Sequence, residues 1–172
     1  MDWCDTKYPR VLIVGLGNEL LGDDGVGVHA VRALLKNPPA GVRAAEVGTR
    51  VLRAQQLLED ADVVIAIDAV RAGGRPGTVY RLHAEDVDMQ QSYSLHDMGI
   101  AGLLRIMPED SRPCVIILGV EPETIDYGTD LSPTVRSALG RVVNAAHQII
   151  EDVRTSGLSS LNPGPLRVRD SQ

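Results

Sequence analysis

The chain has 172 residues, of which 44% are hydrophobic and 23% charged, as expected for one compact globular domain. Its formal net charge of -6 argues against a nucleic-acid binder, because phosphate contacts need clustered Lys and Arg. No apolar run reaches the length of a membrane helix, and the polar, acidic amino terminus lacks the features of a signal or transit peptide. We therefore expect a cytoplasmic protein that binds neither nucleic acid nor a membrane, with Cys4 and Cys114 as thiols.

The predicted elements alternate between apolar strands and helices. With 3% aromatic residues and no Phe, the core has to be built from Val, Leu, Ile and Ala. The clearest strand is apolar on both faces, as an inner strand of a parallel sheet should be. In chain order, the sequence predicts strand 10–15, helix 24–36, strand 42–47, helix 51–60, strand 62–68, edge strand 78–83, helix 94–107 and strand 113–120. This order predicts a three-layer α/β/α domain with a mostly parallel, twisted sheet of about five strands, as in phosphorylase/hydrolase-like folds.

The last predicted helix has the best-defined ends. Ser132 is placed as its N-cap, Pro133 at its first position and Gly157 just past its end. Residues 1–155 are therefore expected to form a single domain. Residues 156–172, rich in Ser, Pro and Gly, are expected to form a flexible tail.

A glycine-rich turn with two aspartates follows the first strand. It invites a dinucleotide-binding interpretation, but the third glycine of GxGxxG is replaced by Leu20. Asp23 and Asp24 would also repel a pyrophosphate at the helix amino terminus. One of these aspartates is expected to cap the helix, which leaves the other to point into the crevice beyond the strand ends, where α/β folds bind ligands.

Two further polar residues fall at positions suited to a site. Asp68 closes the apolar strand, where it either takes part in function or hydrogen-bonds the following turn. His96 is expected in the first turn of a helix, whose dipole favours the neutral imidazole that can accept a proton or bind a metal. Two carboxylates and one imidazole would make an open divalent-metal site. HExxH and GxSxG motifs are absent, so an ordinary zinc protease helix or a serine hydrolase elbow is not indicated.

Four segments together resemble the hydrogenase maturation endopeptidases, over about residues 10 to 155. In order, they are VLIVGLGNELLGDDGVG (11–27), the strand ending in Asp68, SLHDMG (94–99), and GVEPE (119–123) with Gly128 and Leu131–Pro133. The metal-contacting residues of that family fall on Asp24, Asp68 and His96. The first of these positions is Glu or Asp in the family.

The resemblance implies an endopeptidase that removes a short C-terminal peptide from a [NiFe]-hydrogenase large-subunit precursor. Nickel already placed in the precursor would be the recognition signal, contacted transiently by Asp24, Asp68 and His96 as both metal-binding and catalytic residues. No other cofactor is implied, and a monomer is expected. An aspartic-type and a metal-assisted mechanism both remain open.

Three alternatives remain at this point. The same triad could hold nickel in a non-catalytic maturation chaperone. The turn could bind a nucleotide, or the peptidase could act on another precursor. In the peptidase interpretation, the acidic loop 121–130 is expected to help dock the partner.

Overall fold

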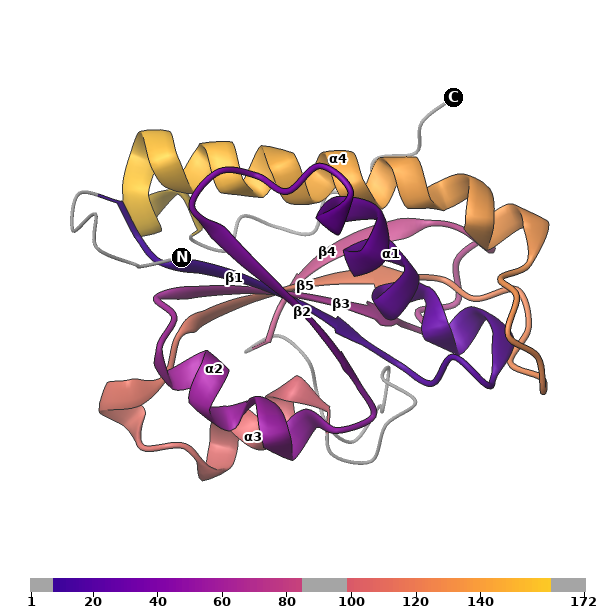
Figure 1. Ribbon diagram of the computed structural model, residues 1–172, viewed down its shortest axis with the longest axis horizontal. Helices are drawn as coiled ribbons and strands as arrows, with labels where there is room; N and C mark the ends of the chain where they lie inside the picture. Colours follow the sequence, from indigo (N-terminus) through magenta and orange to yellow (C-terminus); the bar gives the residue numbers. More distant parts are fainter. Residues whose placement is uncertain (1–7, 85–98, 162–172) are drawn as a thin grey trace.

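The computed structural model describes residues 8–84 and 99–161 (Figure 1). The strands are β1 (Val11–Leu16), β2 (Val42–Gly48), β3 (Val63–Ala69), β4 (Val79–His83) and β5 (Cys114–Val120). The α-helices are α1 (Val26–Leu35), α2 (Gln55–Glu59), α3 (Ile100–Ile106) and α4 (Pro133–Ser156). Short 3-10 turns are η1 (Gly22–Gly25), η2 (Val51–Ala54), η3 (Glu109–Ser111) and η4 (Gly157–Leu161).

The strands form one five-stranded sheet in the order β2-β1-β3-β5-β4. The first four strands in this order are parallel, and β4 pairs with β5 antiparallel at the edge. The chain winds outward from β1 to β2 and then returns to β3 on the other side of β1. The order therefore reverses between β1 and β3, and crevices at such switch points are the usual ligand sites of open α/β sheets.

Helices cover both faces of the sheet, which confirms the predicted three-layer α/β/α fold (Figure 1). One half of the core joins alternate residues of the inner strands to α1 and α4, and the other half joins the intervening residues to α2, α3 and η2. Ile65 and Ile67 of β3 belong to the first half, whereas Val64 and Ala66 belong to the second. By this alternation, Asp68 lies on the face covered by α2 and α3.

Close packing of α1 on the sheet explains one glycine of the turn. A methyl group on Gly27 would lie 2.1 Å from the carbonyl oxygen of Ile67 and 2.5 Å from that of Leu16. Only glycine fits there, because both neighbours are backbone atoms of buried strands. Gly27 thus brings the beginning of α1 against the carboxyl ends of β1 and β3.

The ends of α4 agree with the sequence. The Ser132 side chain accepts a hydrogen bond from the Val135 N–H at 3.2 Å, Pro133 is the first helical residue and Gly157 follows the last. Beyond the helix, Leu161 is 2% exposed and joins the core half that contains α4. Ordered contacts therefore extend past residue 155, the expected end of the domain. The expectation of a flexible tail remains a prediction for residues 162–172, which lie outside the described residues.

One predicted helix differs from the structure, and another is described only in part. The segment expected as one helix over 51–60 is split into η2 and α2. In the segment expected as one helix over 94–107, α3 covers Ile100–Ile106, and its N-cap Gly99 has an extended ψ of -176°. Residues 94–98, among them His96, lie outside the described residues, so the placement of His96 in the first turn of a helix stays a prediction.

No helix in the described ranges has both the length and the apolar character needed to cross a bilayer. Cys114 forms no disulfide with another described residue, and Cys4 lies outside the described ranges.

Candidate active site

Both predicted aspartates of the site lie at the switch point between β1 and β3. Asp24 is the third residue of η1, which follows β1, and is 1% exposed. Asp68 is the penultimate residue of β3 and is 3% exposed. The turn η1 packs directly against β3, so the two buried carboxylates belong to elements in contact at the carboxyl edge of the sheet.

A backbone donor orients each of these carboxylates. Asp24 Oδ2 accepts the N–H of Asn18 at 2.8 Å, and Asp68 Oδ1 accepts the N–H of Ala69 at 2.9 Å. The second bond is the turn contact that the sequence left open as an alternative for Asp68. It engages one oxygen with the neighbouring residue and is compatible with a role in a site.

The same contact weighs against the nucleotide interpretation of the turn. In dinucleotide-binding turns, backbone N–H groups of the glycine-rich loop bind the pyrophosphate. Here the Asn18 N–H already donates to Asp24, and the buried carboxylates of Asp24 and Asp68 at this edge of the sheet would repel a phosphate. The turn therefore carries negative charge where a nucleotide-binding turn would bind a phosphate.

The expected capping role of Asp23 or Asp24 is wrong. The N-cap of α1 is Gly25, that of η1 is Leu21, and neither makes a side-chain capping bond. The helix begins with a 3-10 turn, so both aspartates lie inside that turn rather than at a cap.

Asp23 instead bonds a segment about a hundred residues further along the chain. Its carboxylate accepts the backbone N–H groups of Glu123 at 2.9 Å, Thr124 at 3.2 Å and Ser132 at 2.7 Å. The side chain is fully buried. Asp23 therefore fixes the loop between β5 and α4 to the turn that carries Asp24, a role that no local sequence pattern indicates.

Glu121, at the beginning of the acidic loop expected to help dock the partner, is also a buried carboxylate. It is 6% exposed, and its Oε2 accepts the N–H groups of Ala72 and Gly74 and the hydroxyl of Tyr80. Glu121 thus joins the loop after β3 to β4 and β5. Its contribution to docking charge in loop 121–130 is excluded by this burial.

Burial, and next the hydrogen bond to Glu121, raises the pKa of Tyr80 to about 12. The neutral phenol is favoured in the folded state, so its contribution to stability is complete below pH 10 and is lost as the pH rises through about 12. We expect Tyr80→Phe to lower the free energy of unfolding by about 1 kcal/mol at pH 8, and this difference should vanish above pH 12. Urea unfolding at both pH values measures it. An ultraviolet titration in which wild type and variant show the same late-ionising tyrosines would contradict the assignment.

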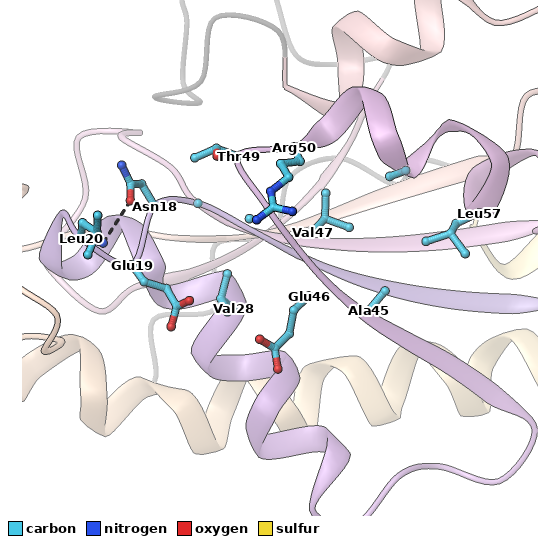
Figure 2. Close-up of a pocket in the computed structure, with 13 residues that line it drawn as sticks. Asn18, Glu19, Leu20, Val28, Ala45, Glu46, Val47, Thr49, Arg50 and Leu57 are labelled. Carbon is cyan, nitrogen blue, oxygen red and sulfur yellow. Dashed lines mark hydrogen bonds between the residues drawn. The ribbon is translucent and has the colours of Figure 1, made fainter.

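A pocket of about 470 Å³ opens beside the site, between the turn after β1 and the carboxyl end of β2 (Figure 2). Asn18, the donor to Asp24, is part of its wall, whereas Asp24 and Asp68 are not. Figure 2 shows Glu19 and Glu46 on one side and Arg50 on the other. The other lining residues are Gly17, Leu20, Val28, Ala45, Val47, Gly48, Thr49, Ala54 and Leu57. No local sequence pattern indicates this pocket, because its walls come from the turn after β1 and from α1, β2, η2 and α2.

Arg32 of α1 holds the acidic side of the pocket in place. Its guanidinium donates to Glu46 at 2.8 Å and to Glu19 at 3.0 Å, and these carboxylates raise the pKa of Arg32 above its usual value. The pocket wall is therefore a charged network that joins α1, β2 and the turn after β1.

Within residues 8–84 and 99–161, no three His, Cys, Asp or Glu side chains are grouped so as to hold a metal ion. The described part of the chain thus contributes two of the three predicted ligands, Asp24 and Asp68. His96 precedes α3, which covers the same face of the sheet as Asp68, but the segment that carries it is not described. The complete triad remains a prediction.

The structure defines an α/β domain with two buried carboxylates at the switch point of its sheet, and comparisons with known proteins show its family. Residues 28–149 match the family model described as hydrogenase maturation protease. The chain is 34% identical to the hydrogenase expression/formation protein HupD of Rhodobacter capsulatus, over 88% of this chain and 75% of that protein. It is 30% identical to the hydrogenase 2 maturation protease of Escherichia coli, over 88% of this chain and 95% of that protein.

Solved structures agree with this relationship. The hydrogenase maturating endopeptidase HybD of Escherichia coli superposes with a TM-score of 0.73 at 28% identity, covering 86% of this chain and 94% of that one. The [NiFe] hydrogenase maturation protease HybD of Thermococcus kodakarensis gives a TM-score of 0.71 at 29% identity, covering 82% and 99%. The chain belongs to the hydrogenase maturation protease family and is an endopeptidase.

Proposed function

We propose that this endopeptidase removes a short C-terminal peptide from the nickel-loaded precursor of a [NiFe]-hydrogenase large subunit. The observation that carries the proposal is the pair of buried carboxylates, Asp24 and Asp68, at the switch point of the sheet. Burying two carboxylates costs free energy that a cation between them would offset. The nickel of the precursor would supply that charge on binding, and the protein acts in the cytoplasm in this proposal.

His96 is the third residue of the proposed site, as the resemblance implies. Carboxylate oxygens are hard ligands and an imidazole nitrogen is intermediate between hard and soft. Without a thiolate, such a set can contact a divalent ion and release it. The three residues would contact the metal that the substrate carries, and the protein would need no permanently bound metal.

Hydrolysis requires a water to attack the peptide carbonyl and a proton to reach the leaving amine. Asp24 and Asp68 are oriented by backbone N–H groups, so either can receive the proton of the attacking water and pass it on. Alternatively, the nickel of the substrate would polarise the peptide carbonyl and so accelerate the attack of water. Both routes use the same two carboxylates.

The pocket beside Asn18 supports a peptide substrate. It extends from the turn that holds Asp24 along the end of β2, and it offers both charges and apolar walls. We propose that the segment of the precursor next to the cleaved bond lies in this pocket (Figure 2).

The direct test compares nickel-loaded and nickel-free precursor incubated with the purified protein, with mass spectrometry as the readout. Loss of the C-terminal peptide from the loaded form alone is the expected result. Cleavage of both forms would remove nickel as the recognition signal. No cleavage, together with tight binding of free nickel by the isolated protein, would favour the chaperone function.

A further inference from the structure

Two strongly exposed apolar side chains project from neighbouring loops at the carboxyl edge of the sheet. Tyr127, in the loop between β5 and α4, is 96% exposed, and Leu20, in the turn after β1, is 62% exposed. Backbone hydrogen bonds join the two loops: Gly22 N–H to Gly128 O at 2.8 Å, and Gly128 N–H to Leu20 O at 3.0 Å. Figure 1 shows the loop before α4 beside the turn before α1. The two side chains therefore belong to one surface, here called the rim platform (residues 20–22 and 123–130).

The rim platform is exposed and yet firmly held. Besides the two backbone bonds, the three bonds to the buried carboxylate of Asp23 fix the beginning and the end of the loop. An aromatic side chain on a fixed backbone loses little conformational entropy on binding, and tyrosine is enriched among the residues that dominate interface energies. An exposed tyrosine held in this way, with exposed Leu20 on the joined loop, is suited to bind a partner.

The charge of the rim platform restricts the kind of partner. Glu123 and Asp126 are exposed, and residues 121–132 contain no Lys or Arg. Asp130 is paired with Arg136 at 3.0 Å, so Glu123 and Asp126, which accepts the Thr124 hydroxyl, carry the remaining negative charge of the rim platform. A complementary surface would present an apolar socket flanked by Lys or Arg side chains.

We propose that the rim platform is the docking surface for the folded body of the hydrogenase large-subunit precursor, with Tyr127 as the anchor and Leu20 beside it. This inference rests on the proposed function. It places the anchor, Tyr127, outside the nickel site and outside the pocket for the cleaved segment, whereas Leu20 also lines that pocket and joins the two surfaces. Asp23 and Asp24 are consecutive, so the turn that holds the docking loop also carries the candidate catalytic carboxylate.

The test is the steady-state cleavage of nickel-loaded precursor by Tyr127→Ala, with Ile106→Ala as the matched control. Ile106 is 60% exposed, but it lies on α3, away from the rim platform. We expect Tyr127→Ala to raise KM about tenfold with kcat nearly unchanged, whereas Ile106→Ala changes neither. The double substitution Glu123→Lys and Asp126→Lys should raise KM further. It should also weaken the increase of KM with salt, because the attraction to a basic partner is removed.

The outcomes separate the inference from the function on which it rests. If wild type cuts the precursor and Tyr127→Ala cuts it with the same KM, the docking surface is wrong and the proposed function stands. An equal rise in KM for Ile106→Ala would also overturn it, because the effect would not be specific to the rim platform. If wild type neither binds nor cuts the loaded precursor, the proposed function fails and the docking surface with it.

Discussion

Asp24→Asn and Asp68→Asn should each abolish cleavage of the nickel-loaded precursor, with kcat/KM reduced about a thousandfold or more. Asparagine has nearly the same shape as aspartate and can still accept the backbone N–H of Asn18 or Ala69. What it removes is the negative charge that would meet the metal or take up a proton. His96→Ala should have an effect of the same order. Mass spectrometry of the precursor measures all three.

The stability of these variants distinguishes a functional site from a structural one. Asp24 and Asp68 are 1% and 3% exposed, and replacing a buried charge by a neutral group of similar shape is often neutral or stabilising. We expect the free energy of unfolding to fall by no more than about 1 kcal/mol in either variant. A loss of activity that is accompanied by unfolding would not support the assignment.

Asp62→Asn is the matched control at the other end of β3. Asp62 immediately precedes the strand, where it accepts the backbone N–H of Arg10 at 2.7 Å and its guanidinium at 2.8 Å. This partly exposed pair should cost about 1 kcal/mol when broken. Cleavage per folded molecule should stay at the wild-type level. If the Asp24 and Asp68 variants cut as fast as this control, their catalytic assignment is wrong, although the family membership is unaffected.

The sequence predicted the sheet well because its strands carry strong local signals. β1, β3 and β5 are apolar on both faces, which identifies inner parallel strands without knowledge of their neighbours. The ends of α4 were predicted by Ser132, Pro133 and Gly157, each of which acts within one turn of the helix. Asp68 could be placed at the carboxyl edge of the sheet because it ends one of these strongly apolar strands.

The parts that could not be predicted depend on contacts between distant segments. Asp23 and Asp24 are adjacent residues of the same type, so the local pattern could not decide which one serves the crevice, and only the family resemblance pointed to Asp24. The structure separates them, because Asp23 meets backbone donors a hundred residues away. Glu121 was assigned to the acidic loop expected to help dock the partner for a similar reason, since its partners Gly74 and Tyr80 come from another part of the chain.

Asp23→Ala should lower the free energy of unfolding by about 3 to 5 kcal/mol, the largest stability change we expect from a single polar residue in this protein. The substitution leaves the partly buried N–H groups of Glu123, Thr124 and Ser132 without their acceptor, and each unsatisfied donor costs about 1 kcal/mol or more. Urea unfolding followed by circular dichroism measures the loss. Hydrogen exchange of these three amides should accelerate well before that of the inner strands.

Asp126→Ala provides the comparison within the same loop. Asp126 is exposed and bonds only the side chain of Thr124 among the described contacts, so its removal should change stability by no more than about 0.5 kcal/mol. Asp23→Asn should fall between the two, because one amide oxygen can replace only part of what two carboxylate oxygens accept. Equal stability of Asp23→Ala and Asp126→Ala would show that the carboxylate of Asp23 does not hold the loop. In the expected case, Asp23 supports the proposed docking surface while the adjacent Asp24 serves the proposed site, so one turn couples the two.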